Sequence, residues 1–289
     1  ANALGDVTIV ATLGSILDGN LGVLNITADA LSLTAANGIG TITDFATATG
    51  DPIEIAVNSI AAASTSTAGS VIHLSQTGSL TIGAGSVVIA GANAGSAIIQ
   101  ATGDINAGAV ASIALTGGDS LSLNSGGTLT IPDAGFTTAG NLRLVGTTDV
   151  VDAGATPRNL TLSAADLFFR SGDAGADTTL TTSVTTLDAA LTGAGSLTVS
   201  ETDGVTLTNV NTFNGAITLT TGGATAVTNV TATSGAGADA NDISITASAG
   251  DITVTTVNNA NALGDVTIVA TTGSILDDEA LLASTTVIT

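Results

Sequence analysis

The sequence of 289 residues contains no Cys, Met, Trp or Tyr, and it has only five Phe and three Pro. Without Cys, the chain forms no disulfide and has no thiol chemistry, so its redox compartment cannot be inferred from cysteine pairing. Without Trp and Tyr, it lacks the aromatic platforms on which sites for sugar rings usually depend. These absences argue against thiol chemistry and against a carbohydrate-acting enzyme.

Positive charge is also scarce. Three Arg and one His stand against 24 acidic residues, which gives a formal net charge of −21. Proteins bind phosphate backbones through clustered cations, so nucleic acid is excluded as a partner, and an anionic membrane surface is disfavoured for the same reason. Most acidic residues are Asp beside Gly, Asn or Ala, which predicts that they lie in turns and keep the chain soluble.

Long hydrophobic runs are missing too. No segment of 18 apolar residues occurs, so we expect no transmembrane helix within this sequence. The sequence begins at Ala1 in the middle of a pattern, without a basic segment followed by an apolar run. We therefore expect no signal peptide here, and we expect any export signal or membrane anchor to lie outside this sequence.

The abundant residues are Ala, Val, Ile, Leu, Thr and Gly, with 44% hydrophobic residues and 36 Gly. They form triplets in which one polar residue separates two aliphatic residues, as in Val7–Ile9, Leu121–Leu123 and Leu197–Val199. Each triplet places two aliphatic side chains on one face of a strand and one polar side chain on the other. This regular alternation argues against disorder, and the frequent Gly and β-branched residues argue against helices.

The spacing of the triplets distinguishes between β architectures. Neighbouring triplets often follow one another closely, and similar triplets recur further along, as from Leu121 to Leu142 and from Leu197 to Ile217. This spacing predicts an all-β fold, a right-handed parallel β-helix (β-solenoid) with little or no helix. Each turn of the coil, here called a rung, is expected to contain roughly 20 residues and three short strands.

One long repeat is visible in the sequence. Residues 2–18 recur at 261–277, an offset of 259, with Leu13 replaced by Thr272. We therefore predict one continuous β-solenoid over 1–289, in which 1–259 is one repeat and 260–289 begins the next. With rungs of the predicted length, one repeat would hold about 13 rungs. The segments that break the rhythm, and are expected to bulge from the coil, are Thr43–Asp51, Ala134–Gly140, Asp149–Pro157, Phe168–Asp173 and Ser234–Asp242.

Several strings resemble the repeats of known bacterial proteins. Leu31–Thr41, Gly50–Ile55 and Gly193–Leu207, together with the duplicated Gly-Asp-Val-Thr-Ile string, resemble the repeats of giant filamentous-haemagglutinin-type and autotransporter-like bacterial exoproteins. The resemblance covers most of the chain. It implies a β-helical adhesin stalk that is secreted or attached to the bacterial cell surface.

Catalysis has little support in the sequence. His73 is the one His, and it occupies the polar position of the triplet Ile72–Leu74, where we expect it to point outward into solvent. No acidic residue lies close to it in sequence, and no Ser stands in a nucleophile-elbow motif. We therefore expect no enzyme, and no catalytic or cofactor-binding residues.

A calcium site has better support, although the fold is not expected to require a cofactor. Gly172–Asp177 partly resembles the Gly-Gly-x-Gly-x-Asp loop of calcium-binding β-rolls, and Gly235–Asp239 with the following Asp242 is a weaker match. Ca²⁺ takes six to eight oxygen ligands from carboxylates and carbonyls. The candidate ligands are Asp173, Asp177, Asp239 and Asp242. The alternative is that these Asp and Gly residues only form turns.

The three Arg residues lie close together in the sequence, at Arg143, Arg158 and Arg170. The first two are expected to pair with acidic residues of neighbouring rungs, for which the candidates are Asp149, Asp152 and Asp166. The alternative is that the Arg residues form a docking point for an adjacent acidic fibre.

The leading functional prediction is a structural rod segment of a large extracellular or cell-surface fibre or adhesin. Its expected partners are copies of itself, joined head to tail, as tandem repeats or laterally, and a host or neighbouring cell surface is a further candidate. One alternative is a calcium-dependent surface-layer or matrix protein, and a more distant one is a carbohydrate-acting β-helical enzyme. Calcium dependence of folding would distinguish the first two.

Overall fold

The structure is a computed structural model that describes residues 4–89, 94–109, 112–154, 158–172, 176–233, 241–260, 263–277 and 287–288. The chain divides into two compact units, Ala1–Pro157 and Arg158–Thr289. Every regular element within the described residues is a β-strand, which confirms the predicted all-β class.

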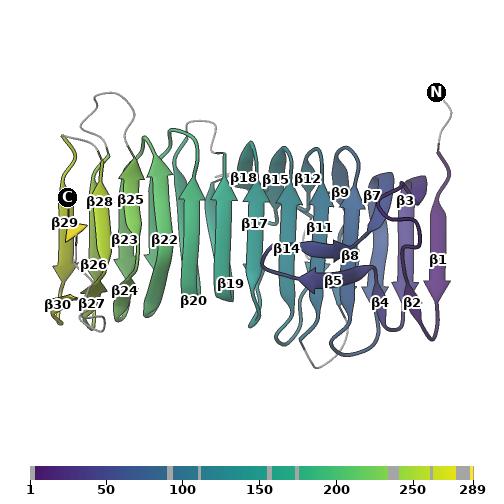
Figure 1. The fold of residues 1–289 in the computed structure, drawn as a ribbon, viewed down its shortest axis with the longest axis horizontal. Coiled ribbons are helices and arrows are strands. Elements are labelled where there is room, and N and C mark those ends of the chain that lie inside the picture. Colours follow the sequence, from purple (N-terminus) through teal and green to yellow (C-terminus); the bar gives the residue numbers. More distant parts are fainter. Residues whose placement is uncertain are drawn as a thin grey trace. The chain divides into compact units, whose positions relative to one another are not determined.

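The first unit is a stack of rungs whose strands pair in parallel with the rungs before and after them (Figure 1). One ladder runs through β2, β4, β8, β11, β14 and β17, and another through β9, β12, β15 and β18. The strands are β1 (Val7–Ala11), β2 (Ser15–Ile16), β3 (Ile26–Ala35), β4 (Gly38–Ile39), β5 (Thr41–Asp44), β6 (Thr49–Asp51), β7 (Ile53–Thr65), β8 (Val71–Gln76), β9 (Leu80–Ile82), β10 (Val87–Ile89), β11 (Ser96–Ala101), β12 (Ile105–Asn106), β13 (Ile113–Ala114), β14 (Ser120–Ser125), β15 (Thr128–Ile131), β16 (Phe136–Thr137), β17 (Leu142–Gly146) and β18 (Asp149–Asp152).

The second unit is built in the same way. Its ladders run through β19, β20, β21, β23, β26 and β29, through β22, β24, β27 and β30, and through β22, β25, β28 and β31. The strands are β19 (Asn159–Ser171), β20 (Thr178–Leu191), β21 (Leu197–Glu201), β22 (Val205–Phe213), β23 (Ile217–Thr221), β24 (Thr225–Val227), β25 (Val230–Thr233), β26 (Ile243–Ala247), β27 (Ile252–Val254), β28 (Thr256–Asn259), β29 (Val266–Ala270), β30 (Ile275–Asp277) and β31 (Val287–Ile288).

The register gives the length of each rung. In the second unit, the step from Leu197 to Ile217 matches the predicted rung length, whereas later steps, such as Ile217 to Ile243, are longer. Rungs of the first unit are mostly longer, and the longest step among the described pairs joins Ile39 to Ile72. The predicted rung of roughly 20 residues therefore describes the shorter rungs, and turns and insertions lengthen the others without disturbing the ladders. The described strands make about 11 turns.

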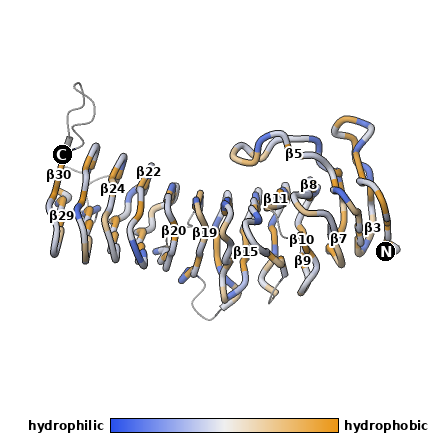
Figure 2. The backbone as a smooth tube through the Cα atoms, turned by 90° about the horizontal axis from the view of Figure 1, so that it is seen from below, coloured by the Kyte–Doolittle hydropathy of each residue, from blue (hydrophilic) through white to orange (hydrophobic). Residues whose placement is uncertain are grey.

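The aliphatic positions of the triplets face the interior. Leu121 and Leu123 of β14 are fully buried, and the register stacks Leu123 between Ile99 of β11 and Leu144 of β17. Such stacks bury apolar area that a single rung leaves exposed, and the ladders pair backbone groups that would otherwise lack partners. The alternation of hydrophobic and hydrophilic residues can be followed along the backbone in Figure 2.

In two of the predicted bulges, most of the described residues form strands instead. Phe168–Ser171 continues β19, and Phe169 is fully buried. Asp149–Asp152 forms β18, paired with β15. The Phe pair was predicted to interrupt the coil. In fact the two-residue alternation continues through it, so Leu167 and Phe169 face the core.

Of two further predicted bulges, one contains a short strand and the other is mostly outside the described residues. Ala134–Gly140 contains the short strand β16, and Phe136 on this strand is buried. Most of Ser234–Asp242 lies outside the described residues.

Thr43–Asp51 does leave the coil, as predicted. It belongs to a slightly longer insertion in which β5 and β6 form an antiparallel hairpin, outside the parallel ladders. The hairpin lies over the outer face of β8 and β11 (Figures 1 and 2).

Candidate functional site

The predicted calcium ligands fall into two groups. Asp177 and Asp242 are exposed, and each accepts a backbone hydrogen bond of 2.9 Å from the next rung, from the amides of Ser196 and Asp265. Asp173 and Asp239 lie outside the described residues. Within the described residues, no three His, Asp or Glu side chains gather as a metal site. The calcium assignment stays a prediction.

The bond from an Asp carboxylate to the next rung recurs along both units. Asp104 accepts from the amide of Thr128 at 2.7 Å, and Asp251 accepts from the amide of Ser274 at 2.8 Å. Each of these Asp residues directly precedes a strand. Such residues were predicted to lie in turns, but this bond was not predicted. A sequence pattern could have indicated this bond, because Gly-Asp before Val or Ile recurs at Gly5–Val7, Gly103–Ile105, Gly250–Ile252 and Gly264–Val266.

These bonds give a prediction that also tests calcium binding. Asp177→Ala is expected to lower the free energy of unfolding by about 1 kcal/mol, because the amide of Ser196 loses its acceptor. Asp177→Asn keeps an oxygen acceptor and is expected to match the parent protein. Urea unfolding with calcium and with chelator measures both effects. A calcium-dependent loss in Asp177→Asn would show instead that the carboxylate is a metal ligand.

Two buried polar side chains occupy equivalent corners of the coil, one in each unit. Gln76 is 3% exposed, and its Oε1 accepts from the amide of Val57 at 3.1 Å while its Nε2 donates to the carbonyl of Val57 at 2.8 Å. Glu201 is 4% exposed, and the amide of Val184 donates to both of its carboxylate oxygens at 3.2 Å. Each side chain reaches back to the preceding rung at a bend in a long strand.

Glu201 differs from Gln76 at the equivalent corner because its side chain can carry a negative charge. Its Oε1 also accepts from the amide of Thr202 at 3.0 Å. Burial raises the pKa of the Glu201 carboxyl, and a side-chain hydrogen bond with Asp203 raises it further, while backbone donors oppose the shift. The arrangement satisfies backbone amides at a bend, so we assign it a structural role.

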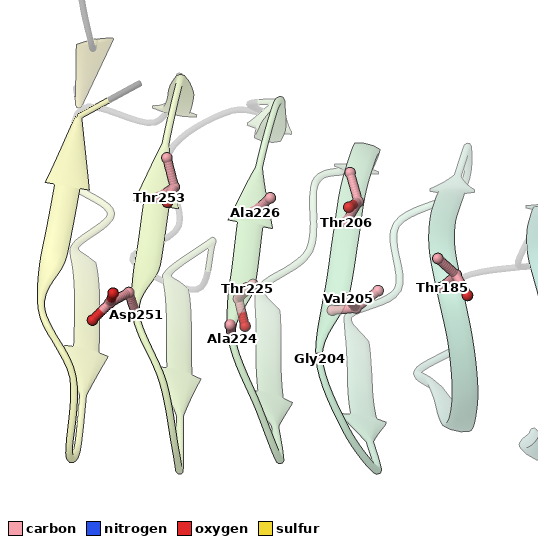
Figure 3. A pocket seen from close by; sticks show the side chains of 9 residues that line it. All are labelled: Thr185, Gly204, Val205, Thr206, Ala224, Thr225, Ala226, Asp251 and Thr253. Atoms are coloured by element: carbon pink, nitrogen blue, oxygen red, sulfur yellow. The ribbon is translucent and has the colours of Figure 1, made fainter. Parts of the chain in front are cut away.

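A shallow groove of about 390 Å³ lies on the outer face of the second unit (Figure 3). Thr206, Ala226 and Thr253 pair in register on β22, β24 and β27, and the small side chain of Ala226 leaves the hollow between its neighbours. Its lining consists of Thr185, Gly204, Val205, Thr206, Ala224, Thr225, Ala226, Asp251 and Thr253. Asp251 alone among these nine is titratable, and it accepts the inter-rung bond described above. The lining offers no acid–base pair.

Arg170 forms an ion pair, a hydrogen bond and a cation–π contact with residues of its own unit. Its Nη2 lies 2.6 Å from Asp188 Oδ1 on the next rung, its Nη1 donates to the carbonyl of Phe169 at 2.8 Å, and its guanidinium lies 3.9 Å from the centre of the Phe168 ring. Both partners of the ion pair are partly exposed, so the pair contributes at most about 1 kcal/mol. This partner was not predicted from the sequence. Pairing of Arg143 and Arg158 with the acidic residues named for them stays a prediction.

His73 is not where we expected it. It does point away from the core, but it is only 1% exposed because the β5–β6 hairpin covers it. The prediction of a solvated His was wrong. Local alternation gives the face on which a side chain lies, but it does not reveal an insertion that folds over that face.

The two copies of the repeated sequence form equivalent strands. Val7–Ala11 is β1, and its counterpart in the second copy, Val266–Ala270, is β29. β1 pairs with the following rung, with Val7 beside Leu31, whereas β29 pairs with the preceding rung, with Val266 beside Ile243.

In the first copy, the backbone groups of every second residue bond to the following rung. The carbonyls of Gly5 and Ala11 accept from the amides of Asp29 and Ala36, each at 3.0 Å. Because backbone groups alternate in direction along a strand, the intervening residues of β1, such as Val10, direct their amides to the opposite edge.

The second copy bonds through the backbone groups of the alternate residues, which point to the other edge of the strand. The carbonyl of Asp265 accepts from the amide of Ile243, and the amide of Thr271 donates to the carbonyl of Ala247, each at 2.9 Å. Asp265 and Thr271 correspond to Asp6 and Thr12 of the first copy. The groups that bond in one copy are therefore those that point to the open edge in the other.

Exposed aliphatic side chains gather at these same rungs. Of the exposed large hydrophobic residues among the described residues, all but Phe213 belong to residues 4–24 or 263–276. They are Leu4, Ile9, Val10, Leu13, Leu17, Leu21, Val23 and Leu24, and Leu263, Val269, Ile275 and Leu276. Apolar exposure is therefore concentrated in both copies of the repeated sequence, beside strands that pair on one side among the described residues.

Comparison of the chain with known protein families, curated proteins and solved structures finds no match. No helix that could cross a membrane is present in the described part of the chain.

Proposed function

We propose that this chain is a structural segment of a large extracellular or cell-surface bacterial fibre or adhesin. In this role it has no catalytic activity and provides length and stiffness through stacked rungs. The parallel solenoid fold and the sequence resemblance support the proposal. Copies of the chain, or tandem repeats of it, are its partners.

The observation that carries the proposal is the complementary use of the repeated rung. The sequence of residues 2–18 pairs with a following rung in one copy, and its near-duplicate pairs with a preceding rung in the other. A single rung of this sequence can therefore bond on both sides at once. In a covalent tandem repeat, Val266 would pair with Ile243 on one side and with the counterpart of Leu31 in the following repeat on the other. Between separate copies, the open edge of β29 would pair with the open edge of β1 in the next copy, while β1 keeps its pairing with β3.

Val10→Pro tests this joint. Proline lacks an amide and clashes with an approaching strand, but the amide of Val10 points away from β3, so the substitution leaves the pairing of β1 with β3 in place. We expect the parent chain to form end-to-end oligomers that grow with concentration. The variant is expected to stay monomeric with an unchanged melting temperature. Sedimentation velocity and electron microscopy measure the assembly.

Val269→Pro is the matched control, because Val269 is the equivalent residue of the second copy. Its amide is directed toward β26, so proline there breaks a bond within the chain, and we expect a lower melting temperature. A parent that stays monomeric at every concentration, or a Val10→Pro variant that assembles like the parent, would overturn the proposed joint.

A further inference from the structure

The β5–β6 hairpin is attached to the solenoid through a small set of polar contacts. His73 Nδ1 lies 2.6 Å from the carbonyl oxygen of Thr41 at the base of the hairpin. Gln100 Nε2 donates to the carbonyl of Ala48 near the tip at 2.8 Å, and it lies 3.2 Å from His73 Nε2. His73 belongs to β8 and Gln100 to β11, so two successive rungs hold the hairpin.

These contacts fix the protonation state of His73. A carbonyl oxygen only accepts hydrogen bonds, so Nδ1 carries a proton and donates it to Thr41. The Gln100 amide nitrogen only donates, so Nε2 of His73 must be the unprotonated acceptor. All three bonds therefore exist together only when the imidazole is neutral.

A second proton on His73 breaks this arrangement. Nε2–H would then face the NH₂ group of Gln100, and two donors would be in contact. Rotating the Gln100 amide would give His73 an oxygen acceptor, but it would remove the donor from the carbonyl of Ala48. Without this rotation the bond between His73 and Gln100 is lost, and with it the bond between Gln100 and the hairpin is lost.

We propose that the hairpin Thr41–Asp51 is an acid-released strap, held on the outer face of β8 and β11 by neutral His73 and freed when His73 is protonated. The solenoid ladders stay intact, because the hairpin pairs only with itself. Ile98, which pairs with His73 in register, is also fully buried although its neighbours Ala97 and Ile99 face the core. Release makes this outer face of the rungs accessible.

The charged groups around His73 are few. β4, β8, β11 and β14 contain no titratable side chain other than His73 itself, and β7, which pairs with β8, contributes Glu54 beside Ser75. The hairpin contributes Asp51, whose charge favours protonation, and Asp44, which bonds to Thr47 and to the amide of Ala46 within the hairpin. Burial outweighs Asp51 and the Thr41 carbonyl, and it holds the pKa of His73 below its ordinary value of 6.5.

The direction of the pH response follows from this shift. With the strap open, His73 titrates near its ordinary pKa, whereas the closed strap keeps it neutral to lower pH. Opening therefore takes up a proton between these two pKa values. Between these two pKa values, the equilibrium constant for opening rises by up to about tenfold for each unit by which the pH falls. At pH values above both pKa values, the strap stays closed.

The test requires the intact chain. Hydrogen exchange of the amides in 41–51, corrected for intrinsic rates, is compared between pH 8 and pH 5, and the single His gives an unambiguous imidazole resonance for the titration. We expect the hairpin to lose protection as His73 titrates, by up to about tenfold for each unit by which the pH falls. The strands β7, β8 and β11 are expected to keep theirs.

Two variants separate the strap from other acid effects. His73→Asn can still donate to the Thr41 carbonyl but does not titrate, so its hairpin is expected to keep its protection at pH 5. Gln100→Leu removes the contact with Ala48 and is expected to expose the hairpin at pH 8. A hairpin that stays protected while His73 is protonated would overturn the proposal. So would an acid response in His73→Asn equal to that of the parent.

Discussion

Leu123→Asp is expected to unfold the first unit at neutral pH. Leu123 is fully buried and stacks between Ile99 and Leu144, so the substitution places a carboxylate inside a continuous aliphatic stack with no partner. Leu123→Ala is expected to lower the free energy of unfolding by about 3 kcal/mol, because it removes the stacking side chain and leaves a cavity. Urea unfolding followed by circular dichroism measures both losses.

Ser122→Ala is the matched control for this position. Ser122 is the preceding residue of the same strand and is equally buried, but its hydroxyl makes no hydrogen bond in the described structure. Removing a buried hydroxyl that lacks a partner is expected to leave stability unchanged or to raise it slightly. Losses of similar size in Leu123→Ala and Ser122→Ala would contradict the assignment of Leu123 to the stack.

Glu201→Ala is expected to lower the free energy of unfolding of the second unit by about 3 kcal/mol. The amides of Val184 and Thr202 would lose their acceptor at a buried bend, and each such loss costs about 1–3 kcal/mol. Glu201→Gln keeps one acceptor oxygen and is expected to retain most of the stability, because Gln76 fills the equivalent corner of the first unit. The same unfolding measurement compares the two variants.

The pH dependence of Glu201→Gln gives a further test. The folded state raises the pKa of Glu201, so it holds the proton to higher pH than the unfolded state does. The parent therefore loses stability as the pH rises from the ordinary Glu value through the raised one. Glu201→Gln lacks this loss, so its stability relative to the parent is expected to rise over that range. A constant difference from pH 4 to pH 8 would show that Glu201 does not titrate differently in the two states.

The sequence alone determined the local part of the fold. The triplet Leu121–Leu123 shows a period of two, and this period fixes which side chains share a face of a strand wherever that strand lies. The recurrence of similar triplets predicted the pairing of Leu121 with Leu142 and of Leu197 with Ile217, and both pairs are present. The all-β parallel solenoid followed from the alternation and the recurrence together.

Only the tertiary structure decided the rest, because the remaining features depend on contacts between residues far apart in sequence. The burial of His73 depends on a hairpin that precedes β7 in the chain, which local alternation around His73 does not show. The bonds from Asp104 and Asp177 to the next rung depend on the register of successive turns. The complementary edges of the two repeat copies likewise depend on which neighbour each strand pairs with. A period of two is a property of one strand, whereas pairing between rungs is a property of the folded chain.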